Sequence, residues 1–175
     1  MSDAPRNDWR PFWILFGLGW ALFAFLVATN GQMVTDASPR GILDHQVAGS
    51  AARIDEIQRA WADSGKLDFA RLSMGVDLVF IGVLSVAGVV GGVRIAGAAK
   101  GPILRRFGWL TTLPFLVFGA TDYAETLSQF VQVMSQGSDV LAQVAAAVNQ
   151  TKVVSFLAGN TALIAGLIGL RLTTA

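Results

Sequence analysis

Four long apolar stretches constrain the fold of this chain more than any other feature. A helix needs roughly 20 residues to cross about 30 Å of hydrocarbon. Stretches of about that length run over residues 11–30, 72–95, 107–131 and 146–170. Because backbone polar groups must satisfy one another inside lipid, each stretch is expected to be a helix. The sequence therefore predicts an all-α, four-helix transmembrane bundle that forms a single integral membrane domain over residues 1–175.

The composition agrees with a chain that has lipid as its main partner. Hydrophobic residues make up 53% of the chain and charged residues only 14%, whereas soluble domains carry about 25% charged residues. The net charge of +1 gives no reason to expect a nucleic-acid partner. The absence of cysteine excludes disulfides, thiolate metal sites and cysteine catalysis. With His45 as the single histidine, a multi-histidine metal or haem site is excluded, and we expect no cofactor and no metal.

The distribution of Lys and Arg beside the predicted spans indicates their orientation, because such residues are enriched in cytoplasmic loops. The basic residues that flank one side of the spans are Arg6, Arg10, Arg94, Lys100, Arg105, Arg106 and Arg171. On the other side, the long loop 31–71 balances its bases with acids, and the last loop carries Asp139 and no base. The sequence predicts a multi-pass membrane protein with both termini on the cytoplasmic side. We interpret its first span as a retained signal anchor.

The loop 31–71 is expected to contain a helix of its own. Residues 50–65 read SAARIDEIQRAWADSG, with apolar residues at helical spacing. Ser50 is the expected N-cap of this helix, and Gly65 is expected to end it. This pattern predicts an extracytoplasmic amphipathic helix between the first and second spans. It would either cover the outer face of the bundle or lie on the membrane surface.

Four acidic or basic residues fall well inside the predicted spans, away from their ends: Asp77, Asp122, Glu125 and Lys152. A rise of 1.5 Å per residue places Asp77 and Lys152 roughly 8–9 Å below the outside ends of their helices. Asp122 lies about 22 Å above the inside end of its helix, with Glu125 one turn higher. All four therefore reach one level in the outer third of the bilayer. Since a charge at that depth costs several kcal/mol unless it is paired or wetted, we expect them to face the bundle interior.

Two interpretations of this charge cluster follow from its residues. In the structural one, Lys152 ties the acids together and fixes the register of the helices. In the functional one, three acids against one lysine leave an excess of negative charge, which protonation, a bound cation or a cationic ligand would relieve. Both interpretations predict that Lys152 lies within ion-pair reach of at least one acid. The supporting polar residues expected nearby are Thr121, Thr126, Gln129 and Asn149.

A pair of small residues in the second span predicts a close helix contact. Gly88 and Gly92 form a GxxxG pair. Small residues let two helix backbones approach each other inside the membrane. We therefore expect this face to pack against a neighbouring helix rather than against lipid.

The adjacent residues Asp44 and His45 in the loop suggest a catalytic pair or a metal ligand. Catalysis needs mutual geometry that neighbours in sequence rarely have, and no serine motif stands beside them. We therefore favour a solvated or capping role for the pair. No nucleophile–base pair or cofactor motif is visible elsewhere, so an enzyme is not expected.

Short motifs between residues 43 and 157 carry a resemblance to a known group of proteins. They are IDEIQRAW ending in Trp61, MGVDLVF with Asp77, GATDYAET with Asp122 and Glu125 in a D-x-x-E pattern, and TKVVSF with Lys152. With these motifs the chain resembles a family of small bacterial four-helix inner-membrane proteins. Such relatives often have Asn where Thr126 follows the D-x-x-E pattern here. The resemblance implies the architecture, the charge cluster and a location in the bacterial cytoplasmic (inner) membrane, and it implies no activity.

Two functions from different classes fit these patterns. The first is a membrane protein that binds an ion, a proton or a small ligand at an outward-facing acidic pocket, with transport as one use of such a site. Four helices leave little room for alternating access, so transport would require a homo-oligomer. The alternative is an accessory or assembly subunit of a larger membrane complex, with a membrane-protein partner, in which the charge cluster is structural.

Overall fold

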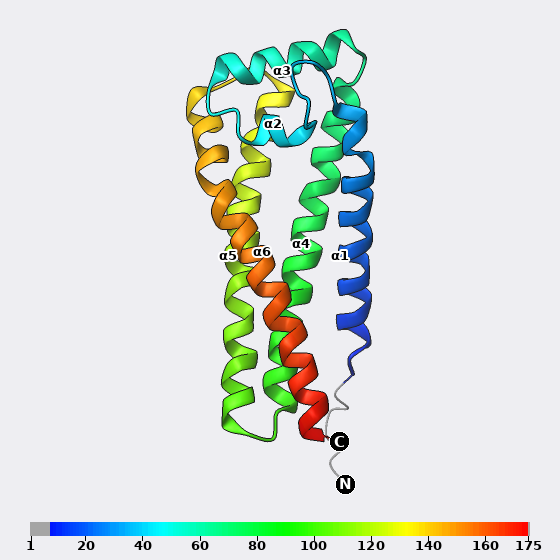
Figure 1. Cartoon of the computed structure of the whole chain (residues 1–175), viewed down its shortest axis with the longest axis vertical. Coiled ribbons are helices and arrows are strands. Elements are labelled where there is room, and N and C mark those ends of the chain that lie inside the picture. The colour runs from blue at the N-terminus through cyan, green and yellow to red at the C-terminus, as the bar shows by residue number, and fades with distance from the viewer. Residues whose placement is uncertain (1–7, 175) are drawn as a thin grey trace.

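Long helices dominate the computed structural model of the chain, which describes residues 8–174 (Figure 1). In chain order the helical elements are α1 (Arg10–Thr29), the 3₁₀ turn η1 (Asn30–Met33), α2 (Ile42–Gln46), α3 (Ala51–Asp63), α4 (Leu67–Ala98), α5 (Pro102–Met134) and α6 (Asp139–Thr174). Within the described residues there is no strand, so the all-helical prediction is confirmed.

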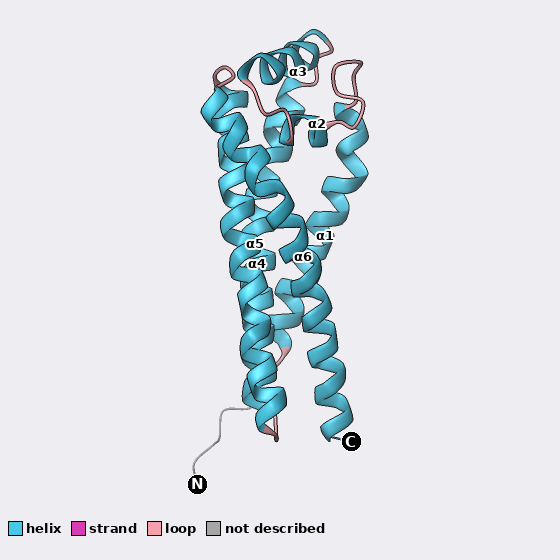
Figure 2. Ribbon diagram, turned by 60° about the vertical axis from the view of Figure 1, so that its left-hand side comes forward, coloured by secondary structure: helices cyan, strands magenta, loops and turns pink. Residues whose placement is uncertain are grey.

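The long helices α1, α4, α5 and α6 run side by side, while α2 and α3 lie across one end (Figure 1). The start of α1, the end of α6 and the short turn between α4 and α5 lie at the opposite end. Helix α5 packs along both α4 and α6, and α1 packs mainly on α4. Figure 2 shows the same arrangement from a second side, with the short helices again confined to one end.

In the described part of the chain, three segments are long and apolar enough to cross a membrane: Arg10–Met33, Leu67–Ala98 and Asp139–Thr173. They contain three of the predicted spans and indicate a membrane protein. The span predicted over residues 107–131 lies within α5, which is 33 residues long but is not among these segments. Its composition is too polar to identify it as a span by apolar content alone, so the sequence prediction of a fourth span is not confirmed.

Helix α5 is polar toward the bundle and apolar toward the outside. Its buried residues include Asp122, Glu125 and Gln129. Its exposed residues include Leu113 and Leu116, each more than half exposed. This distribution reverses the usual arrangement of a water-soluble helix, whose apolar side faces the core.

Glycines allow α4 and α5 to approach closely. A Cβ atom on Gly88 would overlap the ring of Phe115, and one on Gly92 would lie 2.7 Å from the carbonyl oxygen of Gly108. Gly108 in turn lies against the backbone of Ala96. The prediction that Gly88 and Gly92 face a neighbouring helix is confirmed, because both glycines meet residues of α5.

Helix α3 covers the end of the bundle. As predicted, the hydroxyl of Ser50 caps it by accepting a hydrogen bond from the backbone N–H of Arg53 (3.4 Å). Gly65 follows its end with a φ of 67°, a left-handed conformation that favours glycine. Trp61 is fully buried and donates from Nε1 to the carbonyl oxygen of Met33 at 2.8 Å. These contacts favour the covering role over a position on the membrane surface.

Candidate functional site

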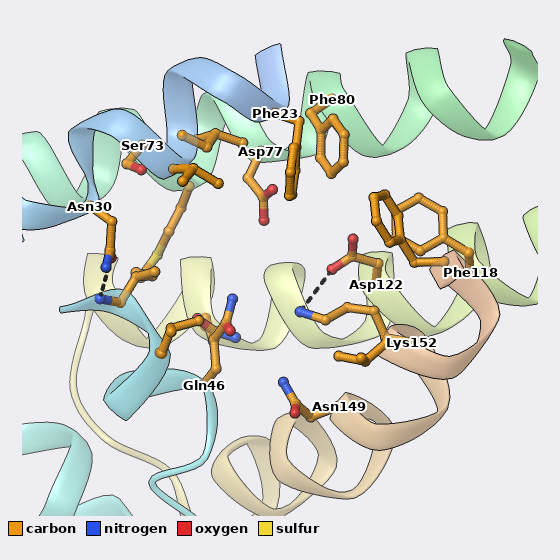
Figure 3. Close-up of a pocket in the computed structure, with 18 of the residues that line it drawn as sticks. Phe23, Asn30, Gln46, Ser73, Asp77, Phe80, Phe118, Asp122, Asn149 and Lys152 are labelled. Carbon is orange, nitrogen blue, oxygen red and sulfur yellow. Dashed lines mark hydrogen bonds and ion pairs between the residues drawn. The ribbon is translucent and has the colours of Figure 1, made fainter. Parts of the chain in front are cut away.

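The four charged residues predicted within the spans lie at one level of the bundle. Lys152 on α6 has its Nζ atom 2.6 Å from Glu125 Oε1 on α5. The same atom lies 3.4 Å from Asp122 Oδ1, also on α5 (Figure 3). Asp122 and Glu125 share a face of α5 because they are three residues apart. Asp77 on α4 lies across the same space (Figure 3). The structure thus places Lys152 in contact with two of the acids, as the sequence predicts.

Glu125 is completely enclosed and well bonded. Its side chain has no exposed surface. Besides Lys152, it accepts hydrogen bonds from Gln129 Nε2 (3.1 Å) and Asn149 Nδ2 (3.0 Å). A buried carboxylate is tolerated when a cation and hydrogen-bond donors surround it. Glu125 and Lys152 therefore form a balanced ion pair that links α5 to α6.

Asp77 and Asp122 are less completely compensated. Asp77 accepts a hydrogen bond from Thr126 Oγ1 at 2.8 Å. Buried Oδ1 of Asp122 accepts no hydrogen bond from the described residues, since Lys152 approaches it only at ion-pair distance. The amine of Lys152 lies closer to Glu125. Two carboxylates thus face the cluster interior with little positive charge to balance them.

Three of the four predicted supporting residues belong to the cluster: Thr126, Gln129 and Asn149. Thr126 makes a polar contact at the position where the resembling family often has Asn. Thr121 was predicted as a fourth member and is not one. Its hydroxyl donates to the carbonyl oxygen of Val117 in its own helix (2.8 Å). Position 121 lies about 100° around the helix from position 122, whereas position 126 lies one turn from it.

His45 is the main polar residue that the sequence placed wrongly. Of the two roles predicted for Asp44 and His45, solvated or capping, the solvated one is wrong, because both side chains are buried. The ring of His45 stacks on Trp61 with ring centroids 5.2 Å apart. Asp44 instead accepts hydrogen bonds from the backbone N–H and the Nε–H of Arg40, both at 2.8 Å, which is a local capping contact.

The hydrogen bonds of His45 connect α2 to the charge cluster. Its Nδ1 lies 3.4 Å from Gln129 Oε1, and its Nε2 lies 3.2 Å from Gln58 Nε2. Since an amide nitrogen only donates, Nε2 accepts from Gln58, and Nδ1–H donates to Gln129. This assignment requires a neutral imidazole, which agrees with the pKa of His45 lowered by burial to about 4. His45, Gln129 and Glu125 thus form one continuous chain of hydrogen bonds.

We expect His45 to make the stability of the protein depend on pH. The unfolded chain takes up a proton near pH 6.5, and the folded protein only near pH 4. The folded state is therefore at its full stability above about pH 6.5 and loses stability as the pH falls toward 4. At about pH 5 the loss should reach about 2 kcal/mol. Denaturant unfolding in detergent at about pH 7 and about pH 5 measures it. His45→Gln has no titratable ring at this position, so its loss of stability between these two pH values should be smaller than that of the wild type by about 2 kcal/mol. Equal losses in the two proteins would contradict the role of His45.

A pocket of about 500 Å³ opens beside the charge cluster, a volume typical of small-molecule sites. Residues from α1, α2, α4, α5 and α6 line it, including Asp77, Asp122 and Lys152. Asn30 and Gln46 lie toward one end, aromatic rings lie toward the other, and the carboxylates lie between them (Figure 3). Glu125 is not among the lining residues. Asp77 and Asp122, the less compensated acids, therefore face the pocket, and Glu125, the balanced acid, does not.

Four phenylalanines close one end of the pocket. Each long helix supplies one of them: Phe23, Phe80, Phe118 and Phe156. Neighbouring rings touch around a closed circuit, with centroid distances of 5.4 to 6.0 Å. We call this set the phenylalanine layer. It brings aromatic surface next to the two acids within one cavity.

Comparisons with known proteins add no family to this description. No protein-family model, curated protein or solved structure matches the chain. The resemblance drawn from the short sequence motifs therefore stays an expectation. The function has to be inferred from the geometry of the pocket and its charges.

Proposed function

We propose that this is an integral membrane protein with four spanning helices, which binds a small ligand in the pocket beside Asp77 and Asp122. The observation that carries the proposal is the presence of these two carboxylates in the wall of a mainly apolar cavity. An ion pair that only joined helices would need no cavity, and Glu125 with Lys152 already joins α5 to α6. Asp77 and Asp122 add negative charge that a ligand or protons must offset.

The contacts and the surface of α5 support its inclusion as the fourth span. It packs beside α4 and α6, two helices that are apolar enough to cross a membrane. Its outward side carries apolar residues such as Leu113, Leu116 and Leu127. Polar residues such as Glu125 and Gln129 face its neighbours and make hydrogen bonds within the bundle. This is the arrangement that lipid as a solvent favours.

The proposed orientation puts α2 and α3 outside a bacterial inner membrane and both termini inside. The basic residues in the turn after α4 and at the start of α5 support it, since Lys100, Arg105 and Arg106 have no acid beside them. They lie at the same end of the bundle as the start of α1 and the end of α6 (Figure 1). In this orientation the phenylalanine layer lies on the cytoplasmic side of the acids.

The topology predicts opposite labelling of two exposed positions. The chain has no cysteine, so Lys100→Cys and Gln136→Cys each introduce a single thiol. A maleimide that cannot cross membranes should label Gln136→Cys in intact cells, and it should label Lys100→Cys only after permeabilisation. Labelling of both variants from the same side would contradict either the four spans or their direction.

Photolabelling in lipid nanodiscs tests whether the pocket binds a ligand. Two alkyl diazirine probes would be used, one with an amine head group and one with an alcohol. At least one of them should label pocket residues such as Leu26 or Met74, and excess unlabelled compound should suppress that labelling because the site saturates. Labelling of lipid-facing Leu113 serves as the control and should not saturate. Pocket labelling that is absent or unsaturable with both probes would contradict the proposal.

The alternative of an accessory subunit receives less support. Close contact with a partner helix in a membrane favours small residues on an open face. Gly88, Gly92 and Gly108 are already used between α4 and α5 within the chain, which leaves the isolated helix glycines Gly17, Gly75 and Gly97 with open space beside them. That the chain binds a membrane-protein partner or forms a homo-oligomer remains a prediction from the sequence.

A further inference from the structure

We infer that the pocket selects a lipophilic organic monocation, an ammonium head group on an apolar tail, that reaches it from the bilayer between α1 and α6. The inference rests on the proposed function and adds the class of ligand and its route. Charge, lining chemistry and the surface around the pocket mouth each support it.

The charge of the pocket wall favours a cation. Lys152 has two acidic neighbours, and its amine lies closer to Glu125 than to Asp122. Asp77 contacts no basic residue within ion-pair distance in the described part of the chain and is held by the hydroxyl of Thr126. An ammonium group between Asp77 and Asp122 would be attracted by both carboxylates.

The lining favours an organic cation over a metal ion. Hard divalent cations require about six to eight oxygen ligands. Within residues 8–174 no group of three or more His, Cys, Asp or Glu side chains is placed to hold a metal ion. The phenylalanine layer instead brings aromatic rings into the same pocket as the acids. Aromatic rings attract ammonium groups and form the cages that bind quaternary ammonium ligands. Two carboxylates with four phenyl rings suit a charged nitrogen that carries alkyl groups.

The surroundings of the pocket point to access from lipid. Several lining residues from three elements are apolar and also exposed: Val27 on α1, Leu43 on α2, and Val153 and Leu157 on α6. Val27 is 61% exposed and Leu157 is 59% exposed, so the pocket opens through an apolar rim. Below this rim, α1 and α6 meet at Phe23 and Phe156. An apolar tail can extend across the rim into the bilayer while the head group stays at the acids.

A series of ligands with one chain and three head groups tests the inference. Dodecylamine, dodecanol and dodecanoate would compete with the amine-headed photoprobe in phosphatidylcholine nanodiscs. Dodecylamine should displace the probe at a concentration about tenfold or more below that of the other two compounds, as expected when charged hydrogen bonds distinguish ligands. Asp77→Asn and Asp122→Asn should each remove most of that preference. Asp63→Asn removes an exposed acid outside the pocket and should keep it.

The outcomes separate this inference from the proposed function. If the three compounds compete equally in wild-type protein, the pocket binds amphiphiles whatever the charge of their head group. The inference then fails and the proposed function stands. If no photoprobe labels the pocket saturably, the proposed function fails as well. The head-group series in wild-type protein decides the matter even if an Asp variant fails to fold.

Discussion

Replacing Lys152 by methionine should destabilise the protein by about 3–5 kcal/mol, the usual effect of removing one partner of a buried ion pair. The amine of Lys152 lies 2.6 Å from Glu125, whose side chain has no exposed surface. Without the amine, the carboxylate keeps hydrogen bonds from Gln129 and Asn149 but loses its cation. Unfolding of the purified variant in detergent measures the loss of free energy.

A second substitution identifies which acid Lys152 stabilises. Lys152→Met with Glu125→Gln should recover most of the lost stability, because the stranded charge is removed. Lys152→Met with Asp122→Asn should recover less, since Asp122 lies farther from the amine at 3.4 Å and lines a pocket. If neither double variant is more stable than Lys152→Met alone, the ion pair does not hold α5 and α6 together.

Gly92→Leu should destabilise the protein by about 3 kcal/mol or more, which is the upper end of the range typical of overpacking. A Cβ atom at this position would lie 2.7 Å from the carbonyl oxygen of Gly108. That oxygen belongs to the backbone of α5, which can give way only if the two helices separate. Thermal unfolding in detergent would show the effect as a large fall in Tm.

Gly97→Leu is the matched control for this prediction. Gly97 lies in the same helix, and nothing lies within 4 Å of a Cβ atom added there. Because glycine inside a helix costs about 1 kcal/mol relative to good helix formers, this variant should be neutral or slightly more stable. Equal losses in the two variants would mean that the contact between α4 and α5 is unimportant.

The helices that the sequence predicted well are those with a simple physical requirement. Continuous apolar length identifies α1, α4 and α6, because hydrocarbon thickness sets a minimum length. The pairing of Lys152 with acids was predictable because an isolated charge in lipid is too costly to remain unpaired. Helix α5 is harder to identify, since Asp122, Glu125 and the other polar residues that build the site also lower its apolar content.

The features that could not be predicted depend on contacts distant in sequence. His45 is buried because Trp61, Gln58 and Gln129 surround it. The local sequence of α2 does not predict these contacts. The pocket depends on how α1 and α6 are spaced above the phenylalanine layer, which no single helix encodes. Thr121 is a different case. It lies on another face of α5 than Thr126, and helical spacing alone could have predicted this.

The central claim is a division of roles: Glu125 and Lys152 hold the helices together, while Asp77 and Asp122 serve a ligand. Saturable photolabelling by the amine-headed probe, measured on Asp77→Asn and Asp122→Asn with their unfolding free energies, tests this division most directly. We predict that both variants keep the stability of the wild type or exceed it, because a buried excess of negative charge is removed, and that both lose the saturable labelling. Variants that lose several kcal/mol of stability and are labelled like the wild type would contradict the claim and would make all four charges structural.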